Sequence, residues 1–300
     1  RCGTGTELCD LMVIFGDDVL LFSDKDCAFP EHTDVKVAWS RWYRRAIEKS
    51  ARQLSGAAAS ARRGARLFSD AACTLELPIR LPPSERMRVH RIAVAHGSVR
   101  ATELHWESFG GKRRSSGSLF LNSELVGKDH YENPFHIGWP IGRDDFVHIL
   151  DDHTLPLLLR ELDTVADLSD YLAKKEKLLR TSGCDFLIPG EEELLTMYLR
   201  NVHEDGTHQF PAVELGALVV LREGMWSEFQ RSKAYAARAD ANALSYLWDN
   251  LVEYQASHVI HGSTQEFFAG DGPPRPNSSE RILRIMASEN RLSRRALGAT

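Results

Sequence analysis

The segment ELCDLMVIFGDDVLLFSDK, residues 7–25, decides how the beginning of the chain folds. Residues 11–15 and 19–22 are unbroken apolar runs, and a Gly-Asp-Asp triplet at 16–18 separates them. Two apolar runs joined by such a triplet predict a β-hairpin, with Asp17 and Asp18 as turn residues.

Charged and polar residues collect at the open end of this hairpin. A two-residue turn places Asp10 opposite Ser23, with Lys25 diagonal to Asp10 on the same face. A turn longer by one residue places Asp24 opposite Asp10 instead. A charge taken out of water costs several kcal/mol unless it is paired, metal-bound or hydrated. The sequence therefore predicts that an acid and a lysine meet at this end of the hairpin.

Two carboxylates and a lysine at the end of a central hairpin suit metal-assisted hydrolysis of phosphodiesters. Carboxylates hold a hard cation such as Mg²⁺ or Mn²⁺ through oxygen ligands. The ion polarises the phosphate and lowers the pKa of its bound water. A lysine orients that water or offsets the charge that develops on phosphorus. The simpler alternative is a cross-strand ion pair between Asp10 and Lys25, worth about 0.2–1 kcal/mol.

The same stretch resembles the PD-(D/E)XK nuclease superfamily, which has the restriction-endonuclease-like fold. In that family an Asp opens one strand of a hairpin and an acid-x-Lys triplet ends the next, followed by a helix and a further strand. The resemblance covers roughly the first hundred residues. It implies that Asp10 and Asp24 bind metal, that Lys25 is catalytic, and that Gln53 or Lys49 supports the site from the following helix.

One position departs from the family pattern, because Ser23 stands where the triplet has an acid. Asp24 could replace that acid through a bulge, Glu7 could supply the second carboxylate, or Ser23 could bind the metal through water. Otherwise the site is degenerate and binds without cutting.

A basic segment follows the hairpin. Residues 36–66 carry nine Lys or Arg residues against a single acid, Glu48, although the whole chain has a formal net charge of −5. Basic side chains beside a nuclease site gain affinity for nucleic acid by releasing its counterions. The residues predicted to contact nucleic acid are Arg41, Arg44, Arg45, Lys49 and Arg52.

Aromatic residues interleave with these arginines on the helix predicted over residues 39–58. Trp39, Trp42 and Tyr43 either stack on bases or form the buried face of that helix. The basic residues, in turn, either contact phosphates or form an ordinary solvated helix face.

The remaining pattern predicts an α/β fold, a mixed central sheet flanked by helices, with a mostly helical C-terminal part. Further strands are predicted at 75–81, 89–95, 146–150 and 213–221. Helices are predicted over 154–179, 191–201, 226–261 and 280–297, and loops over 109–118 and 270–279. A boundary near residues 181–190 divides the chain into a nuclease-like domain, 1–185, and a helical domain of unassigned role, 186–300.

Composition narrows the class of protein. No run approaches the ~18 apolar residues of a membrane helix, so no membrane partner is expected. The five cysteines are widely spaced and contain no Cys-x-x-Cys pair, which argues against a disulfide framework and favours a reducing, cytoplasmic location. His258 and His261 lack the flanking residues of a metal motif.

Together with the hairpin residues, the resemblance implies a Mg²⁺-dependent endonuclease acting on nucleic acid, with DNA favoured, and a role in bacterial antiviral defence or DNA processing. The helical half would recognise a partner protein or form a homodimer. The alternative is a non-catalytic interaction protein built on a degenerate nuclease-like scaffold.

Overall fold

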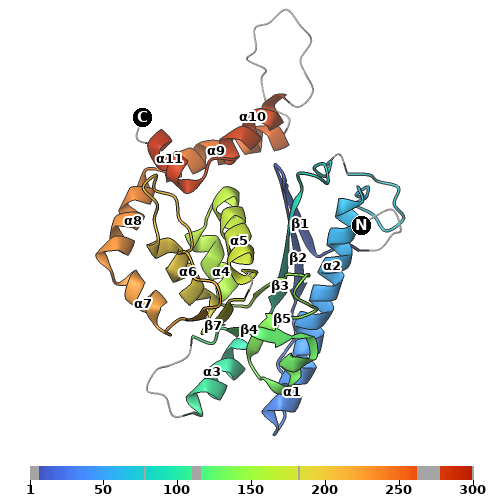
Figure 1. The fold of residues 1–300 in the computed structure, drawn as a ribbon. Helices are drawn as coiled ribbons and strands as arrows, with labels where there is room; N and C mark the ends of the chain where they lie inside the picture. The colour runs from blue at the N-terminus through green and yellow to red at the C-terminus, as the bar shows by residue number, and fades with distance from the viewer. Residues whose placement is uncertain (1–6, 78, 110–115, 182, 262–277, 299–300) are drawn as a thin grey trace, which may run out of the picture.

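The computed structural model describes residues 7–77, 79–109, 116–181, 183–261 and 278–298 of the chain. In these residues the fold is mixed α/β with a helical C-terminal part, as predicted, but helices flank two mixed sheets where one central sheet was expected (Figure 1).

The first sheet has the strand order β1-β2-β3-β6. Its strands are β1 (Leu11–Phe15), β2 (Asp18–Lys25), β3 (Arg88–Ala95) and β6 (His148–Leu150). Strands β2, β3 and β6 run parallel, and β1 is antiparallel to β2. The carboxyl ends of three strands therefore meet at the edge where β1 begins.

The hairpin register is the one that a two-residue turn predicts. Phe15 pairs with Asp18 and Leu11 with Phe22. One step further along the same register, Asp10 lies opposite Ser23. Gly16 at the first central position of the turn has a φ of 59°, a conformation that favours glycine and is the signature of a type II′ turn.

One long helical segment crosses from β2 to β3. It consists of α1 (Val35–Tyr43), a π-helical turn (Arg44–Glu48) and α2 (Lys49–Arg62). Figure 1 shows these helices along one face of the first sheet, with α4 and α5 on the opposite face. The apolar stripe of α1 and α2 packs with Val19, Leu21 and their neighbours in one core, so the helix predicted over 39–58 is confirmed and is longer.

The second sheet has the strand order β5-β4-β7-β8. Its strands are β4 (Phe120–Val126), β5 (His136–Trp139), β7 (Asp185–Ile188) and β8 (Leu218–Val220). Strand β7 pairs with β4, so the predicted domain boundary near residue 185 falls inside a sheet to which both halves contribute.

The remaining helices lie around these sheets. They are α3 (Val99–Glu107), a 3₁₀ turn (Gly127–Glu132), α4 (Thr154–Glu161), α5 (Val165–Leu179), α6 (Glu191–Arg200), α7 (Met225–Gln230), α8 (Lys233–Ala243), α9 (Tyr246–Ile260), α10 (Ser278–Ala287) and α11 (Arg291–Gly298). Helices α9, α10 and α11 pack together at one end of the molecule (Figure 1).

Three predicted helices are each divided. The helix expected over 226–261 forms α7, α8 and α9, and the Ser232 hydroxyl accepts the Tyr235 N–H at 3.2 Å where α8 begins. The helix expected over 154–179 breaks before Thr164, whose hydroxyl accepts a hydrogen bond from the Asp167 backbone N–H at 3.0 Å and so starts α5. The helix expected over 280–297 breaks at Asn290, whose side-chain oxygen accepts from the Ser293 N–H at 2.8 Å.

The strand predicted over 75–81 is wrong for the residues described there. That segment makes one isolated bridge, between Phe68 and Glu76. The predicted strands at 146–150 and 213–221 are shorter than expected. The predicted strand at 89–95 and the predicted helix at 191–201 are confirmed to within one residue at each end. The predicted loops at 109–118 and 270–279 lie largely outside the described residues.

Asp18 is more than the turn residue that its sequence position suggests. Its buried carboxylate accepts hydrogen bonds from Arg88 at 2.8 and 2.6 Å and lies 3.0 Å from His90 Nε2. Burial alone raises the pKa of Asp18, but the hydrogen bonds from His90 and Arg88 outweigh it and lower the pKa to about 2.

We expect this carboxylate to give the protein part of its stability at neutral pH. Its folded pKa lies below the unfolded value of 3.8, so the contribution, about 2 kcal/mol, is present above pH 3.8 and is lost as the pH falls towards 2. Asp18→Asn should lower the free energy of unfolding at pH 7, with a gap to the wild type that narrows on acidification. Urea unfolding of both proteins between pH 7 and 3 measures it; a gap that is constant with pH would contradict this role.

Candidate functional site

The candidate site lies at the carboxyl edge of the first sheet. Because side chains alternate along a strand, Ser23 and Lys25 project from β2 towards the α2 side, and Asp10, which precedes β1, shares that side. The carboxyl ends of parallel strands are where α/β sheets commonly bind ligands. Sequence and topology thus bring these three residues to one edge.

Asp10 and Lys25 form the ion pair that the hairpin register predicts. Lys25 Nζ donates to Asp10 Oδ2 at 3.1 Å, and the backbone N–H of Asp24 donates to the same oxygen at 2.6 Å. Burial raises the pKa of Asp10, but these donors outweigh it and lower the pKa below 3.8, so the carboxylate is ionised at neutral pH. Both side chains keep about a quarter of their surface exposed, 24% for Lys25 and 29% for Asp10.

Helix α2 contributes Gln53 to the same face. Ser23 is fully buried, and its hydroxyl lies 3.4 Å from the Gln53 side-chain oxygen. Ser23 also hydrogen-bonds to Asp10 and helps to lower the pKa of that carboxyl. Asp10, Ser23, Lys25 and Gln53 therefore form one connected cluster, called here the α2-face cluster, as three of its four members were predicted to do.

Asp24 does not join its carboxylate to that of Asp10, which corrects the predicted metal-binding pair. The next residue along a strand points to the opposite face, so the Asp24 side chain leaves the α2 side. Its carboxylate lies 2.6 Å from His96 Nε2, just after β3. What Asp24 gives to Asp10 is its backbone N–H.

His96 links Asp24 to Asp152, which follows β6. Its Nδ1 pairs with the Asp152 carboxylate, which also accepts the Gly97 N–H at 2.7 Å. Burial lowers the pKa of His96, but the hydrogen bonds with Asp152 and Asp24 outweigh it and raise the pKa, which favours an imidazolium that donates to both acids. Gly97 has a φ of 89°, and an added Cβ would lie 2.5 Å from the Cys27 carbonyl oxygen, so a side chain is excluded there.

The sequence analysis missed His96 and Asp152, although a signal for both is present. His96 directly follows the predicted strand 89–95, and Asp152 lies two residues after the predicted strand 146–150. The carboxyl ends of parallel strands share one edge of a sheet. Recognising that β3 and β6 run parallel to β2 would have placed both residues beside Asp24.

The side-chain oxygens on the α2 side could act as ligands of a hard cation, with one carboxylate among them. Asp10, Ser23 and Gln53 present only oxygen atoms as ligands, which suits Mg²⁺ rather than a softer metal. Mg²⁺ commonly keeps several waters and uses one or two carboxylates with substrate phosphates. Within the described ranges, no group of three or more His, Cys, Asp or Glu side chains is placed to hold a metal.

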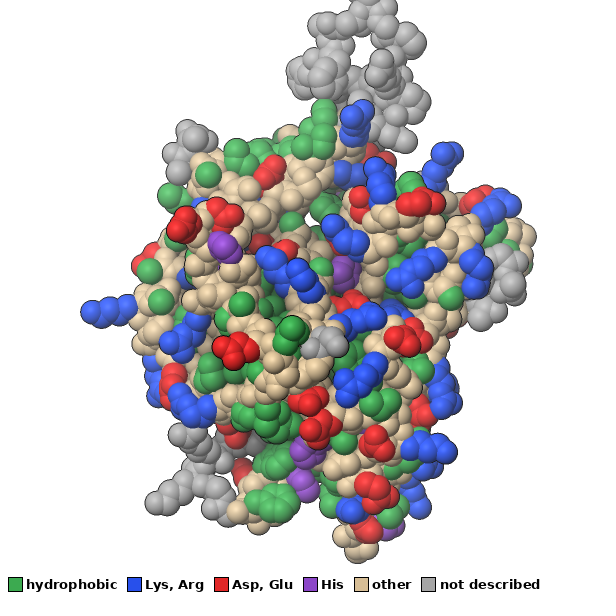
Figure 2. All heavy atoms as spheres, viewed as in Figure 1, with side chains coloured by type: hydrophobic (Ala, Val, Ile, Leu, Met, Phe, Trp, Pro, Cys, Tyr) green, Lys and Arg blue, Asp and Glu red, His purple; other side chains and the backbone are tan. Residues whose placement is uncertain are grey.

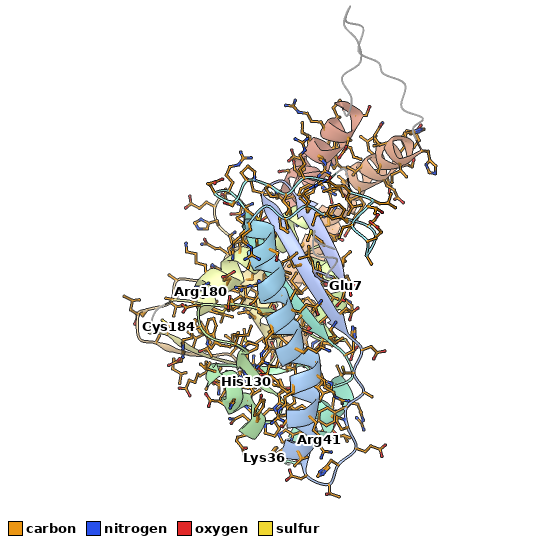
Figure 3. The ribbon with its side chains drawn as sticks, turned by 90° about the vertical axis from the view of Figure 1, so that its right-hand side faces the viewer. Glu7, Lys36, Arg41, His130, Arg180 and Cys184 are labelled. Carbon is orange, nitrogen blue, oxygen red and sulfur yellow. The ribbon has the colours of Figure 1, made fainter. Side chains whose placement is uncertain are left out.

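The predicted nucleic-acid contacts divide into two sets on the crossing helix. Arg41, Arg45 and Lys49 recur every four residues towards Gln53, and Arg45 donates to the backbone oxygen of Ala28, in the loop after β2, at 3.3 Å. All three are exposed, and we call them the basic row. Figure 3 faces this helix and shows Arg41 and Lys36 near its amino end.

The other two predicted contacts point to a different neighbour. Arg44 lies over the Tyr131 ring at 4.3 Å, and Arg52 pairs with Glu48, which accepts a hydrogen bond from Tyr131. Figure 2, viewed as Figure 1, shows Lys and Arg side chains along the edge of the molecule formed by α1 and α2. The basic row is therefore the part of this surface that leads to the cluster.

The aromatic residues of the crossing helix form its buried face. Trp39, Trp42 and Tyr43 are fully buried, and Trp42 Nε1 donates to the backbone oxygens of Cys27 and His96 at 2.9 and 3.0 Å. These rings cannot stack on bases. They instead fix the helix against the loops that carry the site.

Neither the cysteines nor the comparisons with known proteins assign further chemistry to this chain. Cys9, Cys27 and Cys184 are free thiols. No helix in the described part of the chain is long and apolar enough to cross a membrane. A scan of protein-family models found no match, and searches of curated proteins and of solved structures found no significantly similar chain.

Proposed function

We propose that this protein is a metal-dependent nuclease that hydrolyses phosphodiester bonds at the α2-face cluster. The observation that supports it is the meeting of Asp10, Lys25 and Gln53, from three separate elements, at the carboxyl edge of a parallel sheet. The carboxyl ends of parallel strands are also where α/β sheets commonly bind ligands, so an ionised acid and an ammonium held there are candidates for a functional site.

In this proposal Lys25 acts on the phosphate. An ammonium group has three donors, and one of them is used by Asp10. The others can hydrogen-bond to a phosphate oxygen and to the attacking water, offsetting negative charge as it develops. Asp10 holds Lys25 in place and, with the oxygens of Ser23 and Gln53, would hold Mg²⁺ or Mn²⁺. Such an ion polarises the phosphate and lowers the pKa of a bound water.

The basic row would direct the backbone of the nucleic acid to the cluster. Arg41 and Lys49 are exposed and form no ion pair with another described residue, so their charge is available to phosphates. Phosphate contacts position nucleic acid without reading its sequence. DNA as the substrate, and a role in bacterial defence or DNA processing, rest on the family resemblance alone.

A second candidate is a non-catalytic interaction protein on the same scaffold. Two observations favour it: Ser23 replaces the acid of the family triplet, and the Asp24 carboxylate pairs with His96 instead of facing Asp10. In this alternative the Asp10–Lys25 pair only closes the sheet edge, and the helical part would contact a partner protein or a second copy.

A cleavage assay separates the two candidates. The protein is incubated with plasmid, single-stranded DNA or RNA in Mg²⁺, in Mn²⁺, or in EDTA at equal ionic strength. We expect cutting of at least one substrate with either metal and none in EDTA, because phosphodiester hydrolysis here needs the ion. Binding without cutting of any substrate would favour the scaffold, and cutting in EDTA would contradict the metal-dependent mechanism.

A further inference from the structure

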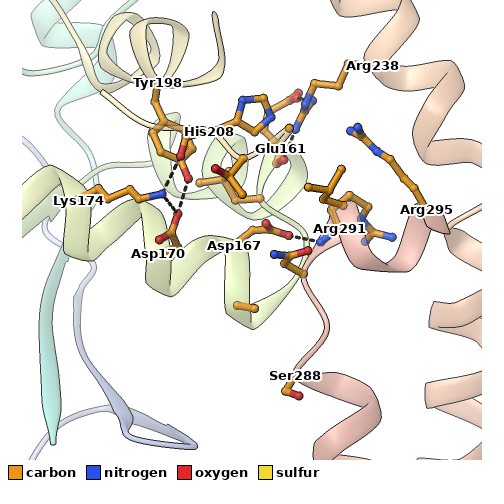
Figure 4. A pocket seen from close by; sticks show the side chains of 16 residues that line it. Glu161, Asp167, Asp170, Lys174, Tyr198, His208, Arg238, Ser288, Arg291 and Arg295 are labelled. Atoms are coloured by element: carbon orange, nitrogen blue, oxygen red, sulfur yellow. Dashed lines mark hydrogen bonds and ion pairs between the residues drawn. The ribbon is translucent and has the colours of Figure 1, made fainter. Parts of the chain in front are cut away.

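A cavity of about 250 Å³ lies in the helical part of the molecule, away from the α2-face cluster. It is enclosed by α5, the loop before Phe210, α8 and the start of α11 (Figure 4). Its volume is below the roughly 300–1,000 Å³ of pockets for drug-sized ligands, so it suits a small molecule.

Two of the three acids that line this cavity in the described residues are paired with cations. Glu161 pairs with Arg238 at 2.8 Å, and Asp170 accepts from Lys174 and from the Tyr198 hydroxyl, both at 2.7 Å. Asp167 accepts the hydroxyl of Thr164 and a backbone N–H, which are neutral donors. Its charge therefore acts on the cavity without forming an ion pair there.

Arg295 is the cation that remains. Its Nε donates to the side-chain oxygen of Asn242 at 2.7 Å, and among the described residues it forms no ion pair. Burial lowers the pKa of Arg295, and the nearby charge of Arg238 lowers it further. In Figure 4 the side chains of Arg238 and Arg295 extend from α8 and α11 into the same space, beside His208. Within the described chain, this half-buried guanidinium therefore has no carboxylate hydrogen-bonded to it, and the negative charge nearest to it is that of Asp167.

Two buried nitrogen atoms in the wall of this cavity lack a hydrogen-bond partner in the described part of the chain. Arg238 Nε and His208 Nδ1 are buried and have no hydrogen-bond partner within the described residues. Buried polar atoms are nearly always satisfied by protein, water or ligand. Burial lowers the pKa of His208 to about 4, with smaller contributions from the charges of Arg238, Arg295 and Lys174.

We propose that this cavity binds the phosphate group of a small molecule, with Arg295 as its main contact and Arg238 and His208 beside it. Guanidinium groups favour phosphate because charge-assisted hydrogen bonds to it are strong and multidentate. The groups converge on the cavity from α8, α11 and a loop. Such an arrangement suits a tetrahedral oxyanion, whose oxygens point in several directions, better than a planar carboxylate, because a single guanidinium can bind both carboxylate oxygens. The cavity has room for a small organic part attached to the phosphate.

Binding is tested by calorimetric titration with inorganic phosphate at constant ionic strength, and with a 5′-mononucleotide and its nucleoside. We expect both phosphates to bind saturably at millimolar or lower concentration and the nucleoside not to bind. Arg295→Gln, which can keep the contact with Asn242, should weaken binding at least tenfold. Arg295→Lys, which keeps the charge, should weaken it less. The surface change Arg180→Gln should leave binding unaltered.

Two further results decide the location. In the wild type, the Nε–H signals of Arg295 and Arg238 should shift on addition of phosphate, a readout that needs no folded variant. Lys25→Ala should leave phosphate binding unaltered, which separates this site from the proposed nuclease site. Equal binding by Arg295→Gln and the wild type, shifts confined to the α1–α2 surface, or no saturable binding would each overturn the proposal.

Discussion

Lys25→Ala should slow phosphodiester cleavage about 100-fold or more, the scale of removing one donor aimed at developing charge. The variant removes the ammonium that pairs with Asp10 and that would contact the phosphate. The pair is partly exposed, so its loss should change the free energy of unfolding by about 1 kcal/mol or less. The measurement is single-turnover cleavage under metal-saturated conditions, with thermal unfolding of the same preparations.

The control is Lys177→Ala, an exposed lysine on α5 far along the chain from the hairpin. It should cut as the wild type does. If Lys25→Ala also cuts at the wild-type rate, the α2-face cluster is not the active site. If cutting is lost together with folding, Lys25→Arg tests the same point, because it keeps the charge and the pairing with Asp10.

Glu191→Gln should give the largest loss of stability, about 3–5 kcal/mol. Glu191 begins α6 and pairs with Lys175 of α5, and both side chains are almost fully buried, with 7% and 3% exposed. The Tyr171 hydroxyl donates to the same carboxylate at 2.7 Å. Removing the negative charge leaves the ammonium of Lys175 buried without a counter-ion, which is far more costly than losing a surface pair.

The matched control is Glu176→Gln, which removes the surface pair of α5 with Arg180 and should cost about 0.5 kcal/mol or less. Combining Glu191→Gln with Lys175→Met should recover much of the loss, because no unpaired charge remains. Urea unfolding of the four proteins gives the comparison. Equal losses for Glu191→Gln and Glu176→Gln would show that the buried pair contributes no more than an exposed one.

Local pattern was sufficient to predict the hairpin and the pairing of Asp10 with Lys25 at its open end. The glycine at the turn fixed the register, and the register places Asp10, Ser23 and Lys25 on one face. That Gln53 faces the hairpin was implied by the family resemblance, and helical spacing added only that Lys49 and Gln53 share one face. These predictions depend on neighbours in sequence or on one crossover, which is the range over which strand alternation and helical spacing are reliable.

Contacts between distant segments were not predictable in the same way. Whether Asp24 turns to Asp10 or to His96 depends on β3 lying parallel to β2 and β6 parallel to β3, and the paired residues are 70 and 56 positions apart in sequence. The second sheet joins β4 to β7 over a similar distance. Nor does sequence pattern indicate that Lys175, in a helix of mixed charge, is buried against an acid.

Binding of Mn²⁺ to purified protein, measured by calorimetry or by electron paramagnetic resonance, tests the central claim most directly. The claim is that Asp10, and not Asp24, supplies the carboxylate on the α2 side. We predict that Asp10→Asn weakens Mn²⁺ binding at least tenfold, whereas Asp24→Asn, which keeps its backbone N–H to Asp10, binds as the wild type does. An equal loss in Asp24→Asn, or no loss in Asp10→Asn, would contradict the account.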